Sequence, residues 1–286
     1  MSFRIVADSS CIVVQMDDPN YTTVPLKVVA AQEYVDNPSL DVAGMIEDLK
    51  NHKGKSGTSC PNVGEWLEAF GDAEEVFGVT ITKNLSGSYN AAKQAAETYM
   101  EEHPDRKVFI IDSLSAGPEL MMIVDKIRQL EAEGNDYETT KEKVLHYANH
   151  NHTLFCLESM TNLARNGRVS PAAAKIAGLL GIRAAGEAQG GTIVPLHKPR
   201  GAKKATETLA EMARERGIRD GSLLRIAHCQ AEEQAMALYE TLKKDFPNLR
   251  FILEPTRALC SFYAEVGGLM IGFEGDYNEV NNNLKF

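Results

Sequence analysis

The sequence predicts an α/β protein with two domains, an N-terminal parallel α/β/α sandwich and a C-terminal α/β domain with a mixed sheet. In the first half, continuous apolar segments of strand length alternate with helix-forming segments, which is typical of a parallel sheet covered on both faces. Near Thr153 the pattern changes and a hairpin signal follows. The length of 286 residues suits two domains of ordinary size. We therefore expect the domains to be residues 1–153 and 154–286.

The elements of the first domain follow from apolar periodicity and from the start signals of helices. Three predicted strands end at small polar clusters, which are Asp8-Ser9-Ser10, Ser86-Gly87-Ser88 and Asp112-Ser113. Because the carboxyl ends of parallel strands line the ligand crevice of an open sheet, we expect these clusters to converge there. In order, we expect a strand at 3–7, an extended segment at 21–30, a helix from Ser39 or Asp41 to about 53–55, a loop at 57–62, a helix begun by Pro61 or capped by Asn62, a strand at 76–81, a helix through 91–96, a strand at 107–111 and helices at 114–131 and 139–150.

The strand–turn–helix segment at 79–96 is the central feature of this half. Ser86-Gly87-Ser88 stands where the strand gives way to the helix, and the first turn of a helix leaves its backbone N–H groups without partners. Those N–H groups and the positive end of the helix dipole favour an anion at this point. The alternative is that Ser86 only caps the helix.

The second domain is predicted to continue with alternating strands and helices. The stretch 189–192, Gln-Gly-Gly-Thr, is typical of a hairpin turn. In order, we expect an apolar segment at 154–157, a helix at 171–180, the hairpin turn with a strand at 193–196, a helix at 203–216, a strand at 223–228, a helix at 232–244, a strand at 250–253, a last strand at 267–273 and a polar tail at 278–286.

Composition excludes several classes of function. A net charge of −10 argues against sequence-independent nucleic-acid binding, which depends on neutralising phosphates. The longest apolar runs are too short to cross a bilayer, and the N-terminus does not resemble a signal peptide. Five scattered cysteines without CxxC spacing fit free thiols in a reducing compartment. We expect a cytoplasmic protein with no integral membrane segment.

Catalytic and metal motifs are weak. His146 and His150 have the spacing of helical metal ligands but lack an acidic partner, so we expect no metal. Ser86 at a strand-to-helix turn resembles a hydrolase nucleophile, yet GxSxG is absent and nothing local positions His197 or His228 as its base. Glycine-rich nucleotide loops are also absent, and we expect no cofactor. Four basic residues near loops are candidates for an anion-facing patch or for ordinary surface charges, namely Arg165, Arg168, Lys198 and Arg200.

Six short motifs follow one another along nearly the whole chain. They are Asp8-Ser9-Ser10, Thr58-Ser59-Cys60-Pro61, Leu85-Ser86-Gly87-Ser88-Tyr89, Asp112-Ser113, Asn166-Gly167-Arg168-Val169 and Lys198-Pro199-Arg200. Together they resemble the DegV family, bacterial fatty-acid-binding proteins that include the binding subunits of fatty acid kinase. The TSxP and LSGxY pieces in this order are the specific part of the resemblance.

The resemblance implies a protein that holds one long-chain fatty acid in a tunnel between its domains and is not itself an enzyme. The carboxylate would bind at Thr58, Ser59, Ser86 and Gly87. Arg168 and Arg200 would contact the head group or a partner, which in some family members is a kinase that phosphorylates the presented carboxylate. Candidate tunnel walls are the apolar stretches at 154–163, 176–182 and 269–273.

Two departures from the family pattern concern the carboxylate end. Family members usually carry a glycine-rich HxGPG loop, whereas the corresponding stretch here is predicted to be Phe273-Glu274-Gly275-Asp276-Tyr277, without the histidine. We therefore expect two acidic residues beside the anion end. The first arginine motif reads NGR where GGR is usual. These departures bear on head-group hydrogen bonding and on coupling to a kinase, and leave binding of the tail plausible.

Two other functions compete with lipid binding. One is a hydrolase or transferase acting on a small carboxylate or phosphate with Ser86 as nucleophile. The other is an interaction protein whose Arg168 and Arg200 face docks an acidic partner. The sequence does not specify chain length or saturation of the acid, the existence of a kinase partner, or the oligomeric state.

Overall fold

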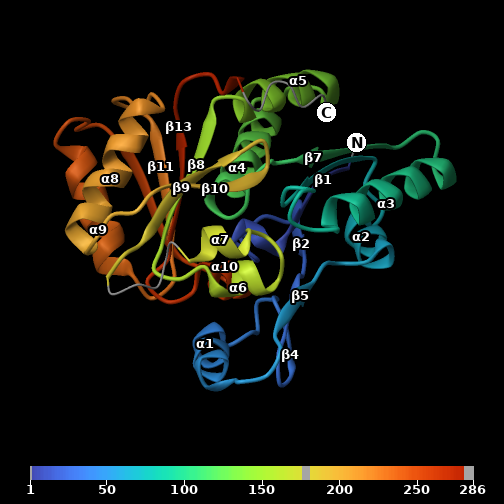
Figure 1. Cartoon of the computed structure of the whole chain (residues 1–286). Coiled ribbons are helices and arrows are strands. Elements are labelled where there is room, and N and C mark those ends of the chain that lie inside the picture. The colour runs from blue at the N-terminus through green and yellow to red at the C-terminus, as the bar shows by residue number, and fades with distance from the viewer. Residues whose placement is uncertain (1, 176–180, 280–286) are drawn as a thin grey trace.

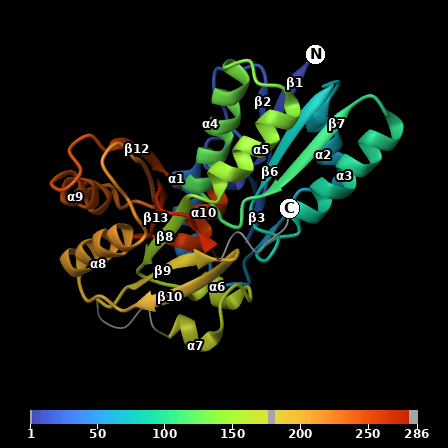
Figure 2. The same ribbon diagram turned by 90° about the horizontal axis from the view of Figure 1, so that it is seen from above.

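The computed structural model describes residues 2–175 and 181–279 and shows two large β-sheets and a small third one, with helices around and between the large sheets (Figure 1). The first half of the chain forms the parallel sheet, and the second half forms the mixed sheet (Figure 2). The α/β class with one parallel and one mixed sheet, predicted from the strand–helix alternation, is confirmed.

The parallel sheet has the strand order β2-β1-β6-β7, with all described pairs parallel. Its strands are continuous apolar runs because both faces are covered. Trp66 and Phe70 of α2 pack with alanines of α3 on one face, while α4 and α5 cover the other. The bounds are β1 Phe3–Asp8, β2 Tyr21–Val24, β6 Glu75–Thr80, β7 Lys107–Asp112, α2 Val63–Phe70, α3 Ser88–Glu102, α4 Pro118–Ala132 and α5 Tyr137–Ala148.

The mixed sheet has the strand order β10-β9-β8-β13-β11-β12. Helices α8 and α9 pack on its outer face through a core of leucines and alanines. The predicted hairpin turn is confirmed, since Gly190 and Gly191 both have positive φ between β9 and β10. The predicted boundary after residue 153 falls inside β8. The bounds are β8 Asn151–Leu157, β9 Ala184–Gln189, β10 Thr192–His197, α8 Ala202–Glu215, β11 Leu223–His228, α9 Glu232–Lys243, β12 Arg250–Pro255 and β13 Leu269–Glu274.

Helix α4 is shared by both sheets, because it packs on β1 and β6 of one and on β8, β11 and β13 of the other. Gly272 of β13 allows the close approach, since a Cβ there would lie 3.0 Å from the backbone nitrogen of Glu119. Arg225 of β11 is buried and donates to Asp125 of α4 at 2.7 Å. The sheets are therefore fixed to one another, and the start of α4 lies between them.

Smaller elements differ most from the prediction. Residues 57–62, predicted as a loop, contain β5, which joins β3 and β4 in a small antiparallel sheet next to α1 (Figure 1). Helix α10 was not predicted. Of the helix predicted at 171–180, the first four residues form α7 and Lys175 is its C-cap, and residues 176–180 lie outside the described residues. The bounds are η1 Ser9–Cys11, β3 Lys27–Val29, β4 Glu33–Val35, α1 Val42–Asn51, β5 Gly57–Ser59, α6 Thr161–Arg165, α7 Pro171–Ala174 and α10 Ala258–Ala264.

Helix caps follow the sequence signals. Asp41 caps α1 by accepting from the backbone N–H of Gly44. Asn62 caps α2 and forms a capping box with Glu65. Of the two alternatives at each start, the structure therefore selects Asp41 and Asn62.

Candidate binding pocket

A pocket of about 850 Å³, partly open to solvent, lies between the two sheets. Its walls come from the segments after β6 and β7, from β8, from the β9–β10 hairpin and from α10. Most lining side chains are apolar, including Leu26, Ile81, Phe155, Leu259 and Met270. This lining favours a mainly apolar ligand.

Thr58 and Tyr263 meet at one side of this pocket. Thr58 lies on β5, and its hydroxyl is 2.8 Å from the hydroxyl of Tyr263 on α10. One proton lies between the two oxygens, so the second hydroxyl proton is available to an acceptor in the pocket. Tyr263 was not singled out in the sequence.

Ser86 reaches the same pocket from the turn before α3. Its hydroxyl accepts from the backbone N–H of Ser88 at 3.2 Å, which leaves its own O–H free to donate. The helix N-cap is Gly87, which makes no side-chain cap. Ser86 therefore accepts a hydrogen bond from the first residue of α3 and also lines the pocket.

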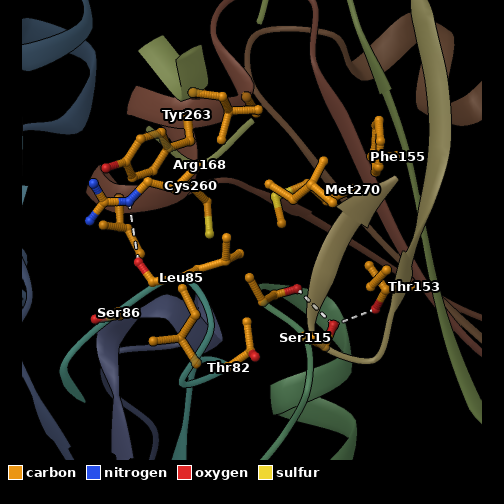
Figure 3. A pocket seen from close by; sticks show the side chains of 18 of the residues that line it. Thr82, Leu85, Ser86, Ser115, Thr153, Phe155, Arg168, Cys260, Tyr263 and Met270 are labelled. Atoms are coloured by element: carbon orange, nitrogen blue, oxygen red, sulfur yellow. Dashed lines mark hydrogen bonds between the residues drawn. The ribbon is translucent and has the colours of Figure 1, made fainter. Parts of the chain in front are cut away.

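Arg168 brings a positive charge to this side of the pocket (Figure 3). Gly167, with φ of 71°, ends α6, and the N–H of Arg168 then donates back to the carbonyl of Leu163 at 2.8 Å. The guanidinium donates to the carbonyls of Leu85 and Asn166 and lies 5.9 Å from the ring centroid of Tyr263. Among the described residues, no carboxylate forms an ion pair with Arg168. The arrangement favours an anionic group at this end.

Three predicted site residues do not line the pocket. Ser59 follows Thr58 on β5 and is exposed, because successive side chains of a strand point to opposite faces. Gly87 is exposed at the start of α3. Arg200 is exposed beyond β10 and bridges Ile182 through its backbone.

The expectation of two acidic residues beside the anion end is wrong. Glu274, at the end of β13, accepts from Arg250 at 2.5 Å and from the backbone N–H of Leu223. Asp276 pairs with Arg219 at 3.5 Å. Neither acid lines the pocket, and no acidic residue is found among the described residues that do. The end of β13 that carries them points away from α10.

The polar cluster after β1 binds the one at the start of α3. Asp8 is buried and accepts from the hydroxyls of Ser10 and Ser88 and from the backbone N–H of Ile81. Burial raises the pKa of this carboxyl despite those hydrogen bonds. The cluster fixes the ends of β1 and β6 relative to α3. The pocket itself is lined by residues just beyond the strands, such as Thr82 and Ser115, rather than by Asp8, Ser10 or Asp112.

A second polar group stands across the pocket from Arg168 (Figure 3). The hydroxyls of Ser115 and Thr153 both line the pocket and lie 2.6 Å apart. Thr153 in turn lies 2.5 Å from Oε2 of Glu119, a buried residue in the first turn of α4. Burial raises the pKa of Glu119 to about 7, although the hydroxyls of Thr153 and Ser115 oppose the shift. None of the three was singled out in the sequence.

The groups needed for serine catalysis are not assembled at Ser86. His228 accepts from the backbone N–H of Ala231 and His197 is exposed, and neither lines the pocket. The rings of His146 and His150 are tilted by 36° to one another, with centroids 4.7 Å apart. In the part of the chain that the structure describes, no group of three potential metal ligands occurs. No helix within 2–175 and 181–279 is long and apolar enough to cross a membrane.

The predicted tunnel walls fall partly on the observed pocket. Phe155, Leu157 and Leu163 from the first stretch and Met270 from the last line it. The middle stretch lies mostly outside the described residues. Four lining residues of the β9–β10 hairpin complete the wall, and the carbonyl of Gly190 there accepts from the side chain of Asn84 at 2.8 Å.

Comparisons with known proteins place the chain in a family. The family model described as "Uncharacterised protein, DegV family" matches residues 2–275. A DegV domain-containing protein of Streptococcus pneumoniae is 38% identical over 282 residues, covering 96% of this chain and 100% of that protein. The structure of a DegV family protein from Eubacterium eligens, loaded with heptadecanoic acid, is 37% identical with a TM-score of 0.93, over 96% of this chain and 100% of that one. The Streptococcus pneumoniae fatty acid kinase (Fak) B3 protein, loaded with linoleic acid, is 38% identical with a TM-score of 0.94 over the same shares. The chain therefore belongs to the DegV family.

Proposed function

We propose that this protein binds one long-chain fatty acid, with the carboxylate at Thr58, Ser86 and Arg168 and the chain in the apolar pocket between domains 1–153 and 154–286. The observation that carries the proposal is the pocket itself, which is mainly apolar and has at one side hydroxyl donors and an arginine that forms no ion pair with a carboxylate among the described residues. Family members with similar sequences hold heptadecanoic and linoleic acids, which supports the same class of ligand here.

Tyr263 adds a donor to the proposed carboxylate site. It lies on α10, and its hydroxyl forms a hydrogen bond with that of Thr58. A phenol in this position offers a hydrogen bond to a carboxylate held beside Thr58. The carboxylate would then receive donors from both domains.

The energetic roles of the two parts of the pocket differ. Burying roughly fourteen methylene groups contributes about 11 kcal/mol gross, at ~0.8 kcal/mol each, before the entropic costs of binding. Each hydrogen bond to the charged head group contributes about 1.5–3 kcal/mol. The tail therefore supplies most of the affinity, and the head-group residues fix which end lies where.

The proposed role is to present the carboxylate rather than to react with it. The similarity to the Fak B3 protein supports a fatty acid kinase as partner, which would supply the phosphoryl group. Arg200 is exposed and outside the pocket, so its proposed contact is with that partner. The free cysteines of the described residues suit a reducing cytoplasm.

Native mass spectrometry of the purified protein, followed by denaturing extraction, tests the proposal. We expect one fatty acid per chain in the native spectrum and its release on unfolding. A serine-directed covalent probe should leave Ser86 unlabelled. Recovery of the chain without any lipid, together with no binding of added octadecanoic acid, would contradict the proposed function.

Variants test the head-group assignment. Thr58→Ala and Ser86→Ala should each raise the dissociation constant for octadecanoic acid about tenfold or more, because each removes a bond to a charged group. Thr208→Ala on α8 is the control, since its hydroxyl bonds the carbonyl of Lys204 far from the pocket. Unaltered affinity in both single variants and in the double variant would count against the assignment.

A further inference from the structure

The hydroxyls of Ser115 and Thr153 form a polar spot in the apolar part of the pocket. Ser115 follows β7 and Thr153 lies on β8, so the two parts of the molecule each contribute one hydroxyl. Both side chains are almost fully buried, yet both line the pocket. Figure 3 shows them on the side opposite Ser86, Arg168 and Tyr263, with Leu85, Cys260 and Met270 in between. A fatty acid held by its carboxylate at Arg168 would bring its chain to this spot.

The hydrogen bonds of this group leave Ser115 with spare capacity. Thr153 has two good partners, Glu119 and Ser115. The hydroxyl of Ser115 lies 2.6 Å from that of Thr153 and also acts on the carboxyl of Glu119, and its contact with the carbonyl of Ala116 is at the 3.5 Å limit, so its oxygen still has room to accept. When Glu119 is ionised, Thr153 donates to it and Ser115 donates to Thr153, so Ser115 is left as an acceptor. When Glu119 is protonated the chain can reverse, and the O–H of Ser115 is free to donate.

We propose that Ser115, supported by Thr153 and Glu119, binds a hydroxyl group on the hydrocarbon chain of the fatty acid, so that the pocket takes hydroxylated fatty acids. This inference rests on the proposed function, because it assumes that the carboxylate is held at the Arg168 side. A hydroxyl group both donates and accepts, so it suits Ser115 in either direction of the hydrogen-bond chain. Elsewhere in the apolar wall, the same hydroxyl would lose its bonds to water without replacement.

Binding of a positional series tests the proposal. Octadecanoic acid is compared with hydroxyoctadecanoic acids that carry the hydroxyl at successive carbons, using delipidated protein and isothermal titration calorimetry. We expect at least one isomer to bind about three- to tenfold more tightly than octadecanoic acid, which is the range for one net hydrogen bond. Isomers with the hydroxyl elsewhere should bind more weakly than the plain acid. If octadecanoic acid binds and every isomer binds more weakly, the proposal is overturned while the proposed function stands.

Variants show which residues cause the preference for the hydroxy acid. The measured quantity is the ratio of the dissociation constant of octadecanoic acid to that of the favoured isomer. Ser115→Ala and Thr153→Val should each remove the preference for the favoured isomer. Thr82→Val, which removes another hydroxyl from the same pocket, should keep the ratio, and Ser86→Ala should weaken both acids while keeping it. A preference that survives in both Ser115→Ala and Thr153→Val would overturn the proposal. Failure of both octadecanoic acid and the hydroxy acids to bind the parent protein would instead count against the proposed function.

Discussion

Glu119 should make the stability of the protein fall as pH rises through the neutral range. Its side chain is buried in the first turn of α4, and no cation pairs with it among the residues that the structure describes. Burial raises its pKa from 4.5 to about 7 in the folded protein. Between these values the folded state holds a proton that the unfolded state has released. The free energy of unfolding therefore decreases with increasing pH across this window.

The size of the effect follows from the shift. A displacement of about 2.5 pKa units corresponds to about 3 kcal/mol at 1.36 kcal/mol per unit, most of it between pH 5 and pH 8. Glu119→Gln removes the titrating group and keeps an oxygen that can accept from Thr153. The variant should match the parent protein near pH 5 and exceed its stability by up to about 3 kcal/mol at pH 8.

The assay is urea unfolding of delipidated parent and variant at pH 5 and pH 8. Comparison with the variant isolates Glu119, because burial also raises the pKa of Asp8, Asp36 and Asp112 in both proteins. Glu131→Gln, at an exposed position of α4, controls for the loss of a carboxyl group. A stability difference between parent and Glu119→Gln that is the same at both pH values would refute the reasoning.

Three further predictions concern single contacts. Tyr263→Phe should raise the dissociation constant of octadecanoic acid about threefold to tenfold, because one donor is lost. Tyr239→Phe on α9, which keeps the ring stacked on Phe251, should leave this constant unchanged. Arg168→Gln should weaken octadecanoic acid more than the corresponding uncharged alcohol, measured by the same titration, and equal losses would contradict a charge contact. Asp125→Ala should lower the free energy of unfolding by about 1–3 kcal/mol, because buried Arg225 loses one of the two carboxylates that pair with it and keeps Glu254. The control is Asp105→Ala at an exposed position, and an equal loss of stability there would contradict this account.

The large strands could be predicted from sequence because burial on both faces makes them continuous apolar runs. The strand predicted at 107–111 is observed as β7, Lys107–Asp112, with only one residue of difference. β5 was missed because three residues are too few to show a period of two. That error also explains Ser59, whose exposure follows at once from its position next to Thr58 on a strand.

Helix α10 was missed for a different reason, which is its almost complete burial. Its sequence, ALCSFYA, has no charged residue and is buried on nearly all sides, so it lacks the polar face that marks an amphipathic helix. Its N-cap, Arg257, makes no side-chain cap hydrogen bond. Tyr263 was hidden with the helix that carries it. Thr153 was hidden in a strand whose residues are all buried, where alternation does not show which face borders a cavity.

The chemistry of the carboxylate end depends on where the second domain places its polar groups. The sequence comparison with the family pattern assigned this role to the end of β13, where Glu274 and Asp276 would repel an anion. The structure instead brings Tyr263 of α10 to Thr58, and it neutralises the two acids with Arg250 and Arg219 away from the pocket. The second domain therefore offers a phenol beside Thr58, and the two acids add no negative charge to the pocket. In the proposed complex the acyl chain would supply most of the affinity, so a neutral phenol beside one arginine would be sufficient to orient the acid.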